Sequence, residues 1–306
     1  MKVGADAPNG GRTIRDPAPA EGPPTVLITG IRSGIGAACA RTFAAAGYRV
    51  LGVVRPDTVS GDQGPSAGDE DCLALDLAAP VDPDAIRARL RQLLPGPRPL
   101  AGLLLCAGES GLAPAAADDA LLRRLLEVNL LANVSLVRAC LPLLQRPGGR
   151  ILILGSRSVS ESLPFLGAYA ASKAALEAWA AALGQELEPS GITVTLVSPG
   201  AVATGMAERL SGPQDEARDH LPFPWLFLGQ RRLLRLLRAD AQRGLPPSTV
   251  AARMLDAYRS PRPPRRIDLD RRPLRAWLRR QLLQRWRAER LARRLWDPNP
   301  DPRLDG

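Results

Sequence analysis

Short apolar runs alternate with longer helical patterns through the first two thirds of the chain. The apolar runs predict strands at residues 25–29, 49–54, 72–75, 100–106, 150–154 and 192–197. The segments between them predict helices at residues 37–46, 81–94, 121–144 and 168–188. Continuous apolar strands that alternate with helices are typical of a parallel sheet whose two faces are both covered. We therefore predict an α/β fold, a doubly wound parallel sheet with ligands at the carboxyl ends of its strands.

The same pattern predicts one folded domain with an extension at each end. The 306 residues suffice for one large core, which we place at 25–260, with a variable substrate lid at about 203–245. Residues 1–24 are rich in glycine, proline and alanine and lack the apolar segment of a signal peptide, so we expect a disordered extension. Residues 261–306 predict a helical, arginine-rich, amphipathic extension. No apolar run approaches the roughly 18–20 residues of a membrane-spanning helix.

Net charge changes this picture only at the C-terminal end. The formal charge of the chain is +10. Residues 261–306 hold 14 arginines and six acidic residues, so this segment alone contributes +8. Charge this local describes an extension rather than the fold, so we expect no nucleic-acid partner. The four cysteines form no C-x-x-C pair and predict free thiols in a reducing compartment. Because His220 is the one histidine, a histidine-based zinc site is disfavoured, and we expect a cytoplasmic protein without a metal.

Tyr169 and Lys173 are the first candidates for chemistry. The chain holds only two lysines, Lys2 and Lys173, and the second follows Tyr169 by four residues. Positions i and i+4 lie on one face of a helix, so both side chains can address one bound molecule. A nearby ammonium lowers the pKa of a tyrosine and makes it a proton donor or acceptor near neutral pH. The spacing alone also fits an ordinary surface tyrosine beside an unrelated lysine, so the surrounding motifs decide.

A glycine-rich turn follows the first predicted strand and opens the first predicted helix. Glycine at 30, 34 and 36 permits a tight turn, a close approach of the backbone to a pyrophosphate, and close helix packing. The helix N-terminus adds N–H donors and a positive dipole end. This strand–turn–helix context is the one that a nucleotide loop requires. The predicted loop residues are Gly30, Arg32, Ser33, Gly34, Ile35 and Gly36.

The end of the second predicted strand favours NADP (NADPH) over NAD. NAD sites place an acid there to bind the ribose 2′-hydroxyl, whereas this chain has Arg55, which can pair with a 2′-phosphate. Arg32 in the glycine loop adds a second cation, although both arginines could also be solvated. After the third strand, Asp76 and Leu77 are candidates for contact with the adenine. The alternative for Asp76 is that it caps the next helix.

In their order and separation, these motifs resemble the short-chain dehydrogenase/reductase family, whose members have a Rossmann fold. The resemblance covers residues 24–206. Its motifs are the glycine loop with Thr29, then Asn129, Ser156, Tyr169 with Lys173, and Pro199 with Gly200. Ser156 lies 13 residues before Tyr169, as the family's catalytic serine does, with Ser158 and Ser160 as the rival serines.

The resemblance implies a role for each catalytic candidate. Tyr169 would exchange a proton with the substrate oxygen, and Ser156 would donate a hydrogen bond to that oxygen. Lys173 would lower the tyrosine pKa and bind the nicotinamide ribose. Asn129 would hold its helix in a form that binds a water connecting Lys173 to solvent. The alternative is a solvent-facing asparagine in an ordinary helix.

The resemblance also implies a nicotinamide end of the site. Ala107 and Gly108 would leave room beside the cofactor, and the loop that follows the sixth strand would contact the carboxamide. The residues predicted for that loop are Pro199, Gly200, Val202 and Thr204. One departure concerns residues 105–106, where the family usually carries two asparagines and this chain has Leu105 and Cys106.

The segment after residue 200 determines substrate choice in this family. Residues 221–228 are unusually apolar and aromatic, which fits either a lid over a lipophilic alcohol or ketone, or a loop packed on its own core. Later residues resemble, loosely, retinol and 17β-hydroxysteroid dehydrogenase relatives. Residues 274–296 predict an amphipathic helix with arginines and tryptophans, which suits an anionic membrane surface, including the inner membrane surface. A helix docked on the body or on a second subunit is the alternative.

We therefore expect an NADP(H)-dependent oxidoreductase that interconverts a lipophilic alcohol and its ketone or aldehyde. The resemblance implies a homodimer or homotetramer. One rival is a 3-oxoacyl reductase acting on a carrier-bound thioester. The other is a protein that binds NADP(H) as a sensor or scaffold without turnover.

Overall fold

The computed structural model describes most of the region between the two predicted extensions. The described residues are 22–56, 71–94, 99–116, 119–145, 147–160, 163–206, 208–210 and 223–270. Outside them lie residues 1–21 of the predicted N-terminal extension, residues 207 and 211–222 of the predicted lid, which include His220, and the predicted amphipathic helix at 274–296.

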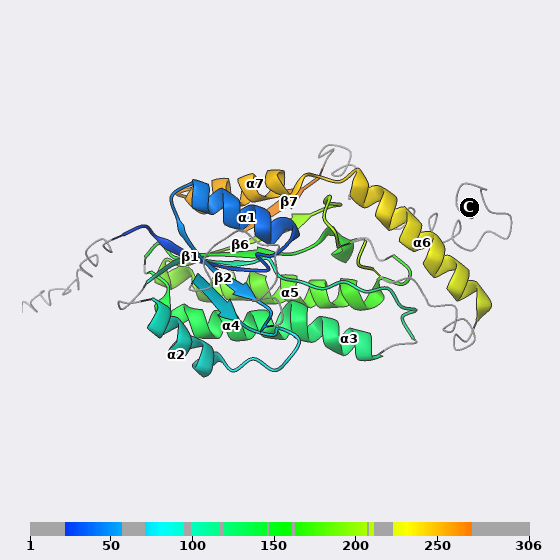
Figure 1. The fold of residues 1–306 in the computed structure, drawn as a ribbon, viewed down its shortest axis with the longest axis horizontal. Coiled ribbons are helices and arrows are strands. Elements are labelled where there is room, and N and C mark those ends of the chain that lie inside the picture. The colour runs from blue at the N-terminus through cyan, green and yellow to red at the C-terminus, as the bar shows by residue number, and fades with distance from the viewer. Residues whose placement is uncertain are drawn as a thin grey trace, which may run out of the picture.

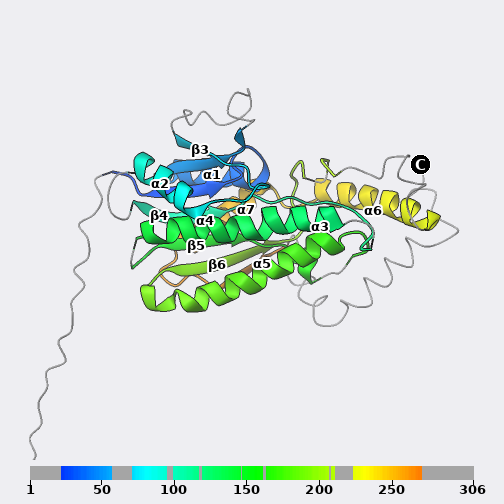
Figure 2. The ribbon, with the colours of Figure 1, turned by 90° about the horizontal axis from the view of Figure 1, so that it is seen from below.

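Seven parallel strands form one sheet, in the order β3-β2-β1-β4-β5-β6-β7 (Figure 2). The strands are β1 (Thr25–Thr29), β2 (Arg49–Val54), β3 (Cys72–Ala74), β4 (Leu100–Leu105), β5 (Arg150–Leu154), β6 (Thr193–Pro199) and β7 (Arg266–Leu269). Each neighbouring pair is parallel, which confirms the predicted doubly wound sheet. The strand order reverses between β1 and β4, and ligands of such sheets bind beyond the strand ends at that point.

Helices cover both faces of the sheet (Figure 1). They are α1 (Gly34–Ala45), α2 (Pro83–Leu93), α3 (Asp119–Leu126), α4 (Ala132–Cys140), α5 (Gly167–Glu186), α6 (Pro224–Gln242) and α7 (Pro247–Arg259). The helices α1 and α7 pack side by side on one face, while α2, α3, α4 and α5 cover the other. In both views α6 extends away from the sheet.

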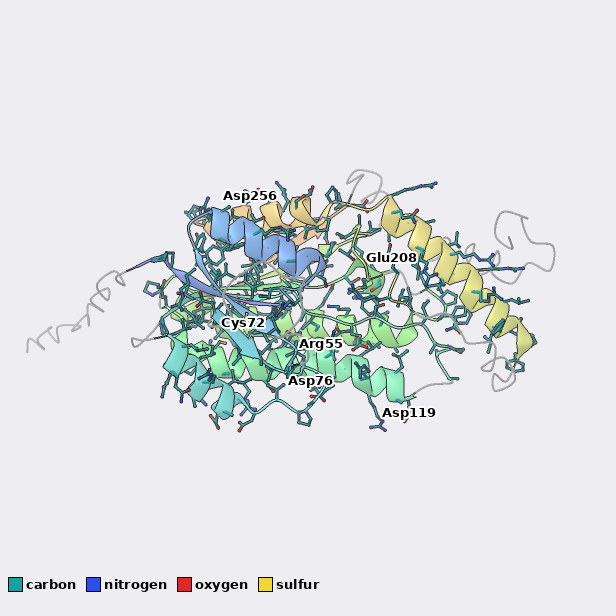
Figure 3. The ribbon with its side chains drawn as sticks, in the orientation of Figure 1. Arg55, Cys72, Asp76, Asp119, Glu208 and Asp256 are labelled. Atoms are coloured by element: carbon teal, nitrogen blue, oxygen red, sulfur yellow. The ribbon has the colours of Figure 1, made fainter. Side chains whose placement is uncertain are left out.

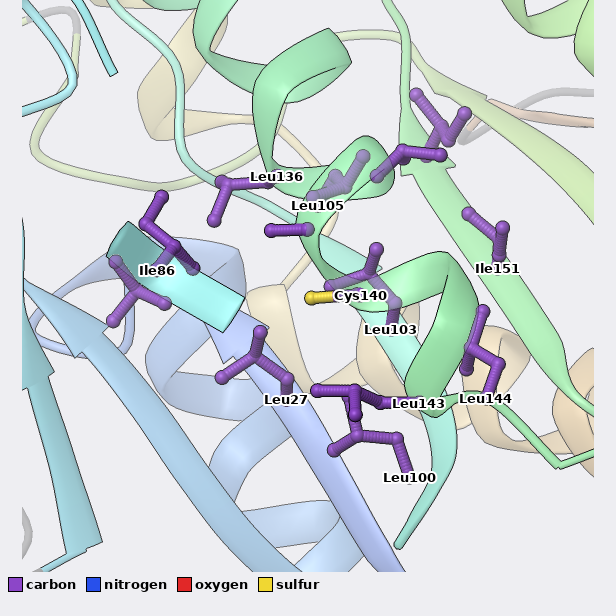
Figure 4. Close-up of a cluster of buried hydrophobic side chains, with 14 of the residues drawn as sticks. Leu27, Ile86, Leu100, Leu103, Leu105, Leu136, Cys140, Leu143, Leu144 and Ile151 are labelled. Atoms are coloured by element: carbon purple, nitrogen blue, oxygen red, sulfur yellow. The ribbon is translucent and has the colours of Figure 1, made fainter. Parts of the chain in front are cut away.

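The larger core lies between the sheet and the face formed by α2, α4 and α5. Leucines from the strand interiors, such as Leu27 and Leu103, are fully buried there against Leu136 and Cys140 of α4 (Figure 4). Burial of a side chain of this size contributes roughly 1.5–3 kcal/mol to the free energy of unfolding. The apolar strand runs are therefore continuous because both faces of the sheet are covered.

The opposite face is closed by an aromatic cluster that joins α1 to α7. The Tyr258 ring of α7 lies edge-on to Phe43 and Tyr48, with both centroid distances 5.2 Å. Gly102 of β4 makes room for this tyrosine, because a Cβ there would clash with the Tyr258 ring.

The structure corrects several predicted boundaries. The helix predicted at 81–94 begins at Pro83, because the Asp82 carboxylate caps it by accepting a hydrogen bond from the Asp84 N–H (2.9 Å). The stretch predicted as one helix at 121–144 contains a π-helical turn at Glu127–Leu131. The domain predicted to end at residue 260 continues through β7, because the Arg266–Leu269 backbone pairs with β6.

One helical stretch, Asp119–Leu143, is long and apolar enough to cross a membrane by length and composition. Half of its most apolar window is buried inside the fold, and it includes α3, the π turn and α4. We interpret it as a core helix of the α/β domain.

Candidate active site

The glycine loop lies against the loops that follow β4 and β6. Gly30 has φ +73°, and a Cβ on it would lie 3.1 Å from Ala107 Cα. Gly34 has φ +57°, and its Cβ would lie 3.3 Å from Thr204 Cγ2. A Cβ on Gly36 would overlap the carbonyl oxygen of Gly30. The three loops therefore meet so closely that side chains at Gly30 and Gly34 would keep them apart, whereas a side chain at Gly36 would distort the glycine loop itself.

Thr29 holds the backbone at residues 106 and 107, next to the position where the family usually carries two asparagines. The Thr29 Oγ1 accepts hydrogen bonds from the backbone N–H groups of Cys106 (2.9 Å) and Ala107 (2.8 Å). Leu105 is buried in the core, and Cys106 is buried beside it. The hydroxyl at the end of β1 thus holds the strand-end backbone, and residues 105 and 106 serve as core side chains.

The start of α1 leaves polar groups available for an anion. Ser33 occupies the N-cap position, its side chain makes no capping hydrogen bond, and the first turn holds no acidic residue. Arg32 precedes it, and within the described part of the chain its buried Nε has no hydrogen-bond partner. Unpaired N–H groups at a helix N-terminus attract phosphate groups. These residues fit the pyrophosphate or 2′-phosphate of a nicotinamide dinucleotide.

Arg55 and Asp76 lie just beyond the ends of β2 and β3 (Figure 3). The Arg55 side chain is exposed. The Asp76 carboxylate accepts a hydrogen bond from the Ala78 N–H (2.9 Å) and so shapes a turn. Since Asp82 caps α2, the alternative in which Asp76 caps that helix is wrong. Contact of Asp76 and Leu77 with an adenine stays a prediction.

Asn129 is completely buried in the π-helical turn rather than facing solvent. Its Nδ2 donates to the Glu109 carbonyl (2.9 Å) and to Ser172 Oγ (3.0 Å). Its Oδ1 accepts from the Glu109 N–H (2.8 Å), and its own carbonyl accepts from Asn133 Nδ2 (2.8 Å). The asparagine therefore ties the loop after β4 to α5, and the water connection to Lys173 stays a prediction.

Lys173 lies buried beside the loop that follows β4. Its Nζ donates to the Leu154 carbonyl (3.0 Å) at the end of β5. A Cβ on Gly108 would lie 3.3 Å from Lys173 Nζ and 3.1 Å from Asn129 Oδ1, so this glycine lets both side chains approach the backbone. Burial lowers the pKa of Lys173 to about 8, against the opposing influence of Cys106 and Glu177.

Tyr169 lies one turn before Lys173 on α5 and is only partly buried. Burial raises its pKa, and a side-chain hydrogen bond with Ser156 opposes that rise. The expectation that Lys173 lowers the pKa of this phenol is therefore wrong for the protein alone. Desolvation disfavours phenolate more strongly than the Ser156 hydroxyl stabilises it.

Of the three candidate serines, Ser156 is the one that reaches Tyr169. Ser158 instead donates to Ser156, through its Oγ (2.9 Å) and its N–H (3.2 Å). Ser160 Oγ donates to the Arg157 carbonyl (2.9 Å). The Ser156 oxygen thus accepts from Ser158, which leaves its own hydroxyl hydrogen to be donated.

The loop after β6 crosses from the sheet to the glycine loop. The Gly200 N–H donates to the Leu269 carbonyl of β7 (2.8 Å). Val202 pairs with Leu245 in an isolated parallel bridge, and Thr204 then reaches Gly34. The structure therefore brings the predicted nicotinamide loop next to the predicted phosphate loop.

A polar group that was not predicted from sequence lies on the far side of Lys173. Glu177 lies one turn after Lys173 on α5, and its Oε1 accepts from Ser198 Oγ (3.0 Å). Its Oε2 pairs with Arg266 Nη1 of β7 (2.7 Å). The i+4 spacing from Lys173 could have drawn attention to Glu177, but the partner 89 residues away could not be read from sequence.

A second missed contact supports the turn that carries Ser156. Arg157 forms an ion pair with Asp270, directly after β7, and their side chains are only 13% and 20% exposed. Within residues 266–270 the apolar and polar side chains alternate, which is a strand signal. The surrounding arginines and prolines concealed this signal, so β7 and its contacts were absent from the prediction.

The predicted lid forms a helix whose inner face packs near Tyr169. The buried apolar cluster there comprises Leu112, Phe165, Leu166, Leu210, Leu233 and Leu234, with Tyr169 and Leu226 packed against it. Gln230, buried in α6, donates from Nε2 to the Leu112 carbonyl (2.8 Å). Phe165 is the one non-glycine residue with positive φ (63°) in the described part of the chain. Such a backbone persists only where packing enforces it.

The sequence also matches a known protein family. The family model described as short chain dehydrogenase matches residues 24–215. The chain belongs to this family of nicotinamide-dependent oxidoreductases. It is 34% identical over 196 residues to the rat dehydrogenase/reductase SDR family member 7B, matching 60% of this chain and 59% of that protein's length. To human 17-beta-hydroxysteroid dehydrogenase type 1 it is 30% identical over 252 residues, which are 78% of this chain and 75% of that one.

Solved structures of the family share the fold. A short-chain dehydrogenase from Streptomyces avermitilis superposes with a TM-score of 0.67 at 24% identity, covering 89% of this chain and 98% of that one. A second from Burkholderia phymatum, in complex with NAD, gives a TM-score of 0.68 at 21% identity, covering 92% and 99%. A third from Sphingobium yanoikuyae, in complex with NADPH, gives 0.59 at 25% identity, covering 91% and 97%.

Proposed function

We propose that this protein is an NADP(H)-dependent oxidoreductase that interconverts a lipophilic alcohol and its ketone or aldehyde. The observation that carries the proposal is the position of Tyr169. Ser156 opposes the rise of its pKa, the residue lies one helical turn from the buried Lys173, and its ring packs against an apolar cluster. An acid/base group at the edge of an apolar wall fits a substrate with one reactive oxygen on a lipophilic body.

Ser156, Tyr169 and Lys173 have separate roles in the reduction of a carbonyl. The bound cofactor would supply hydride to the carbonyl carbon. Ser156 donates its hydroxyl hydrogen to the carbonyl oxygen and stabilises the negative charge that develops there. Tyr169 gives its phenolic proton to the same oxygen. In the oxidative direction Tyr169 removes that proton. Lys173, with its pKa near 8, supplies a positive charge beside the phenol as the proton leaves.

Preference for NADP(H) rests on two arginines. Arg55 stands, exposed, at the end of β2, where an acid would select the ribose 2′-hydroxyl of NAD. Arg32 holds a buried Nε without a partner beside the glycine loop. Guanidinium groups pair with phosphate through charge-assisted hydrogen bonds. A family structure at 25% identity is a complex with NADPH, which is consistent with this choice.

A lipophilic substrate is supported by the wall beside Tyr169. Leu112, Phe165 and Leu233 belong to the buried cluster, and Leu226 packs against it. The human relative at 30% identity is named a 17-beta-hydroxysteroid dehydrogenase, a name that fits a large apolar alcohol.

The four free cysteines are in keeping with a reducing, cytoplasmic compartment.

The test is NADPH oxidation by the purified protein with a panel of lipophilic ketones and aldehydes, with Tyr169→Phe as the control. Turnover by the wild type that disappears in the variant supports the proposal. If NADPH binds but no compound in the panel is reduced, a carrier-bound 3-oxoacyl thioester is assayed next. Binding without turnover of either class contradicts an oxidoreductase and favours the NADP(H) sensor.

A further inference from the structure

The outer surface of α6 exposes large apolar side chains close together. In the described part of the chain four large apolar residues are exposed, and three of them are Phe223, Trp225 and Leu228 at the start of α6. Trp225 is 53% exposed and Leu228 52%. The rings of Phe223 and Trp225 stack, with centroids 4.5 Å apart and planes at 13°. An exposed cluster of this kind on a soluble domain marks a contact surface.

Basic side chains continue the same face along the helix. Spacings of three and four residues lead from Trp225 and Leu228 to Arg231, Arg235 and Arg238, which places all five on one side of α6. Arg231 and Arg238 are exposed, and Arg235 is half-buried. The Arg231 guanidinium lies over the Phe227 ring (5.7 Å), and Arg238 Nη2 donates to the Leu210 carbonyl (3.1 Å), so both keep contacts with the protein while exposing their charge. No acidic residue lies on this stripe. The outer face of α6 is therefore apolar and aromatic at its first turn and positively charged beyond it.

We propose that this outer face of α6 docks on an anionic lipid surface. Phe223, Trp225 and Leu228 would enter the boundary between headgroups and acyl chains, where tryptophan is favoured. The arginines would lie against the headgroups, where basic residues are attracted by the negative surface potential of an anionic bilayer. Figures 1 and 2 show α6 extending away from the sheet, so that it can meet a flat surface.

Charge and apolar surface together select lipid among the possible occupants. A second copy of the chain, related by a two-fold axis at Trp225 and Leu228, would bury these side chains but would leave the arginines without an anionic partner. A nucleic acid would satisfy the arginines but would leave Trp225 and Leu228 without an apolar environment. A bilayer with anionic lipids satisfies both.

The inner face of the same helix carries Leu226 and Leu233, which belong to or pack against the cluster beside Tyr169. If the enzyme acts on a lipophilic substrate, docking of α6 places the apolar cluster beside Tyr169 next to the phase in which that substrate dissolves. That consequence rests on the proposed function. The docking itself does not, because it depends only on the outer face.

The experiment is co-sedimentation of the full-length protein with two kinds of vesicle, phosphatidylcholine alone and phosphatidylcholine mixed with phosphatidylglycerol. We expect binding to the mixed vesicles that weakens as salt is raised. The double variant Trp225→Ser/Leu228→Ser should bind about tenfold or more weakly, because it removes the apolar insertion. Leu131→Ser is the matched control: this leucine is also exposed (48%) but lies in the π-helical turn, and its loss should leave binding unchanged.

Fluorescence locates the contact independently of affinity. Mixed vesicles should shift the tryptophan emission of the wild type to shorter wavelength, and the conservative variant Trp225→Phe should retain binding while losing most of that shift. Unchanged thermal melting and NADPH binding of the variants establish that they are folded.

Four results would overturn the inference. The first is no binding of the wild type to either vesicle, and the second is equal binding to both kinds. The third is full binding by the double variant, which would assign the contact to another segment such as residues 271–306. The fourth is Trp225-dependent self-association or DNA binding without vesicle binding. None of these results bears on NADPH turnover in solution, so failure here is distinguishable from failure of the proposed enzymatic activity.

Discussion

The cofactor side and the substrate side of this molecule are built in different ways. On the cofactor side, glycines 30, 34 and 36 follow one strand within seven residues, and their fit against Ala107 and Thr204 comes directly from the lack of side chains. On the substrate side, α6 and β7 contribute through contacts with residues far away in the chain, such as Gln230 with Leu112 and Asp270 with Arg157. The residues predicted to carry out the reaction therefore lie in short sequence motifs. The residues that surround them are brought there by long-range packing.

This difference predicts which substitutions should affect the reaction and which should affect stability. Substitutions of Tyr169 or Arg55 should alter chemistry or cofactor choice and leave folding nearly intact. Substitutions of the long-range contacts should alter stability and the alignment of the motifs together. The predictions that follow run from the largest expected effect to the smallest.

Tyr169→Phe should show the largest effect on the reaction. Loss of the phenolic proton should lower kcat by about 10²–10⁴-fold, the usual range for removal of a general acid. The affinity for NADPH should stay close to the wild-type value, because the ring remains packed against its apolar cluster. Steady-state kinetics together with NADPH titration measure both quantities. Substantial residual kcat would mean that another group supplies the proton.

Arg55→Asp should change cofactor choice by about 10–100-fold, which corresponds to the roughly 1.5–3 kcal/mol of a hydrogen bond to a charged group. NADPH should bind more weakly, whereas NADH should be much less affected, since a carboxylate can accept from the ribose 2′-hydroxyl. Isothermal titration with both cofactors is the measurement, and Arg41→Asp, an arginine on α1 outside the predicted cofactor residues, is the control. An equal loss for both cofactors would contradict the 2′-phosphate assignment.

Asp270→Ala tests the long-range side of the comparison. It leaves the Arg157 guanidinium without its carboxylate partner at a largely buried position, which should cost about 1–3 kcal/mol of unfolding free energy. We also expect kcat to fall by about tenfold, with little change in KM for NADPH, because the Ser156 turn loses its support. Urea denaturation and steady-state kinetics separate these effects. Asp270→Glu should restore part of both, and a loss of stability at unchanged kcat would limit the pair to a structural role.

The pH dependence of stability tests the burial of Lys173. Its pKa falls from 10.5 to about 8 in the fold, so between these values the unfolded chain binds more protons than the folded one. The free energy of unfolding should therefore rise with pH through this window, relative to Lys173→Met, and should show no such difference in slope below about pH 8. Urea denaturation of both proteins from pH 7 to pH 10.5 measures it. A constant difference between them would mean that the ammonium is not desolvated.

The sequence was sufficient for much of the fold and the site because the relevant signals are local. Six of the strands follow from apolar runs, and the glycine turn between β1 and α1 follows from its strand–turn–helix context. The four-residue spacing of Tyr169 and Lys173 places them on one face of any helix. Local backbone geometry enforces each of these relations, so no tertiary information is needed.

Other features could not be predicted without the tertiary structure. Periodicity predicted one unbroken helix at 121–144, but the buried side chain of Asn129, bonded to Glu109 and Ser172, accompanies a π turn that no pattern indicates. The pKa of Tyr169 was expected to fall because of Lys173. It rises instead because burial dominates, and burial depends on what packs around the phenol.

By itself, then, the sequence determined the doubly wound sheet and the glycine loop, and it named the candidate proton-transfer residues, since these depend on spacings within one strand, turn or helix. Only the tertiary structure decided that β7 completes the sheet and supports the Ser156 turn, and that Thr29 binds the backbone of residues 106 and 107. It also decided that α6 packs its inner face near Tyr169 and exposes its aromatic and basic face. These contacts join residues tens to hundreds of positions apart, and chain folding alone brings such residues together.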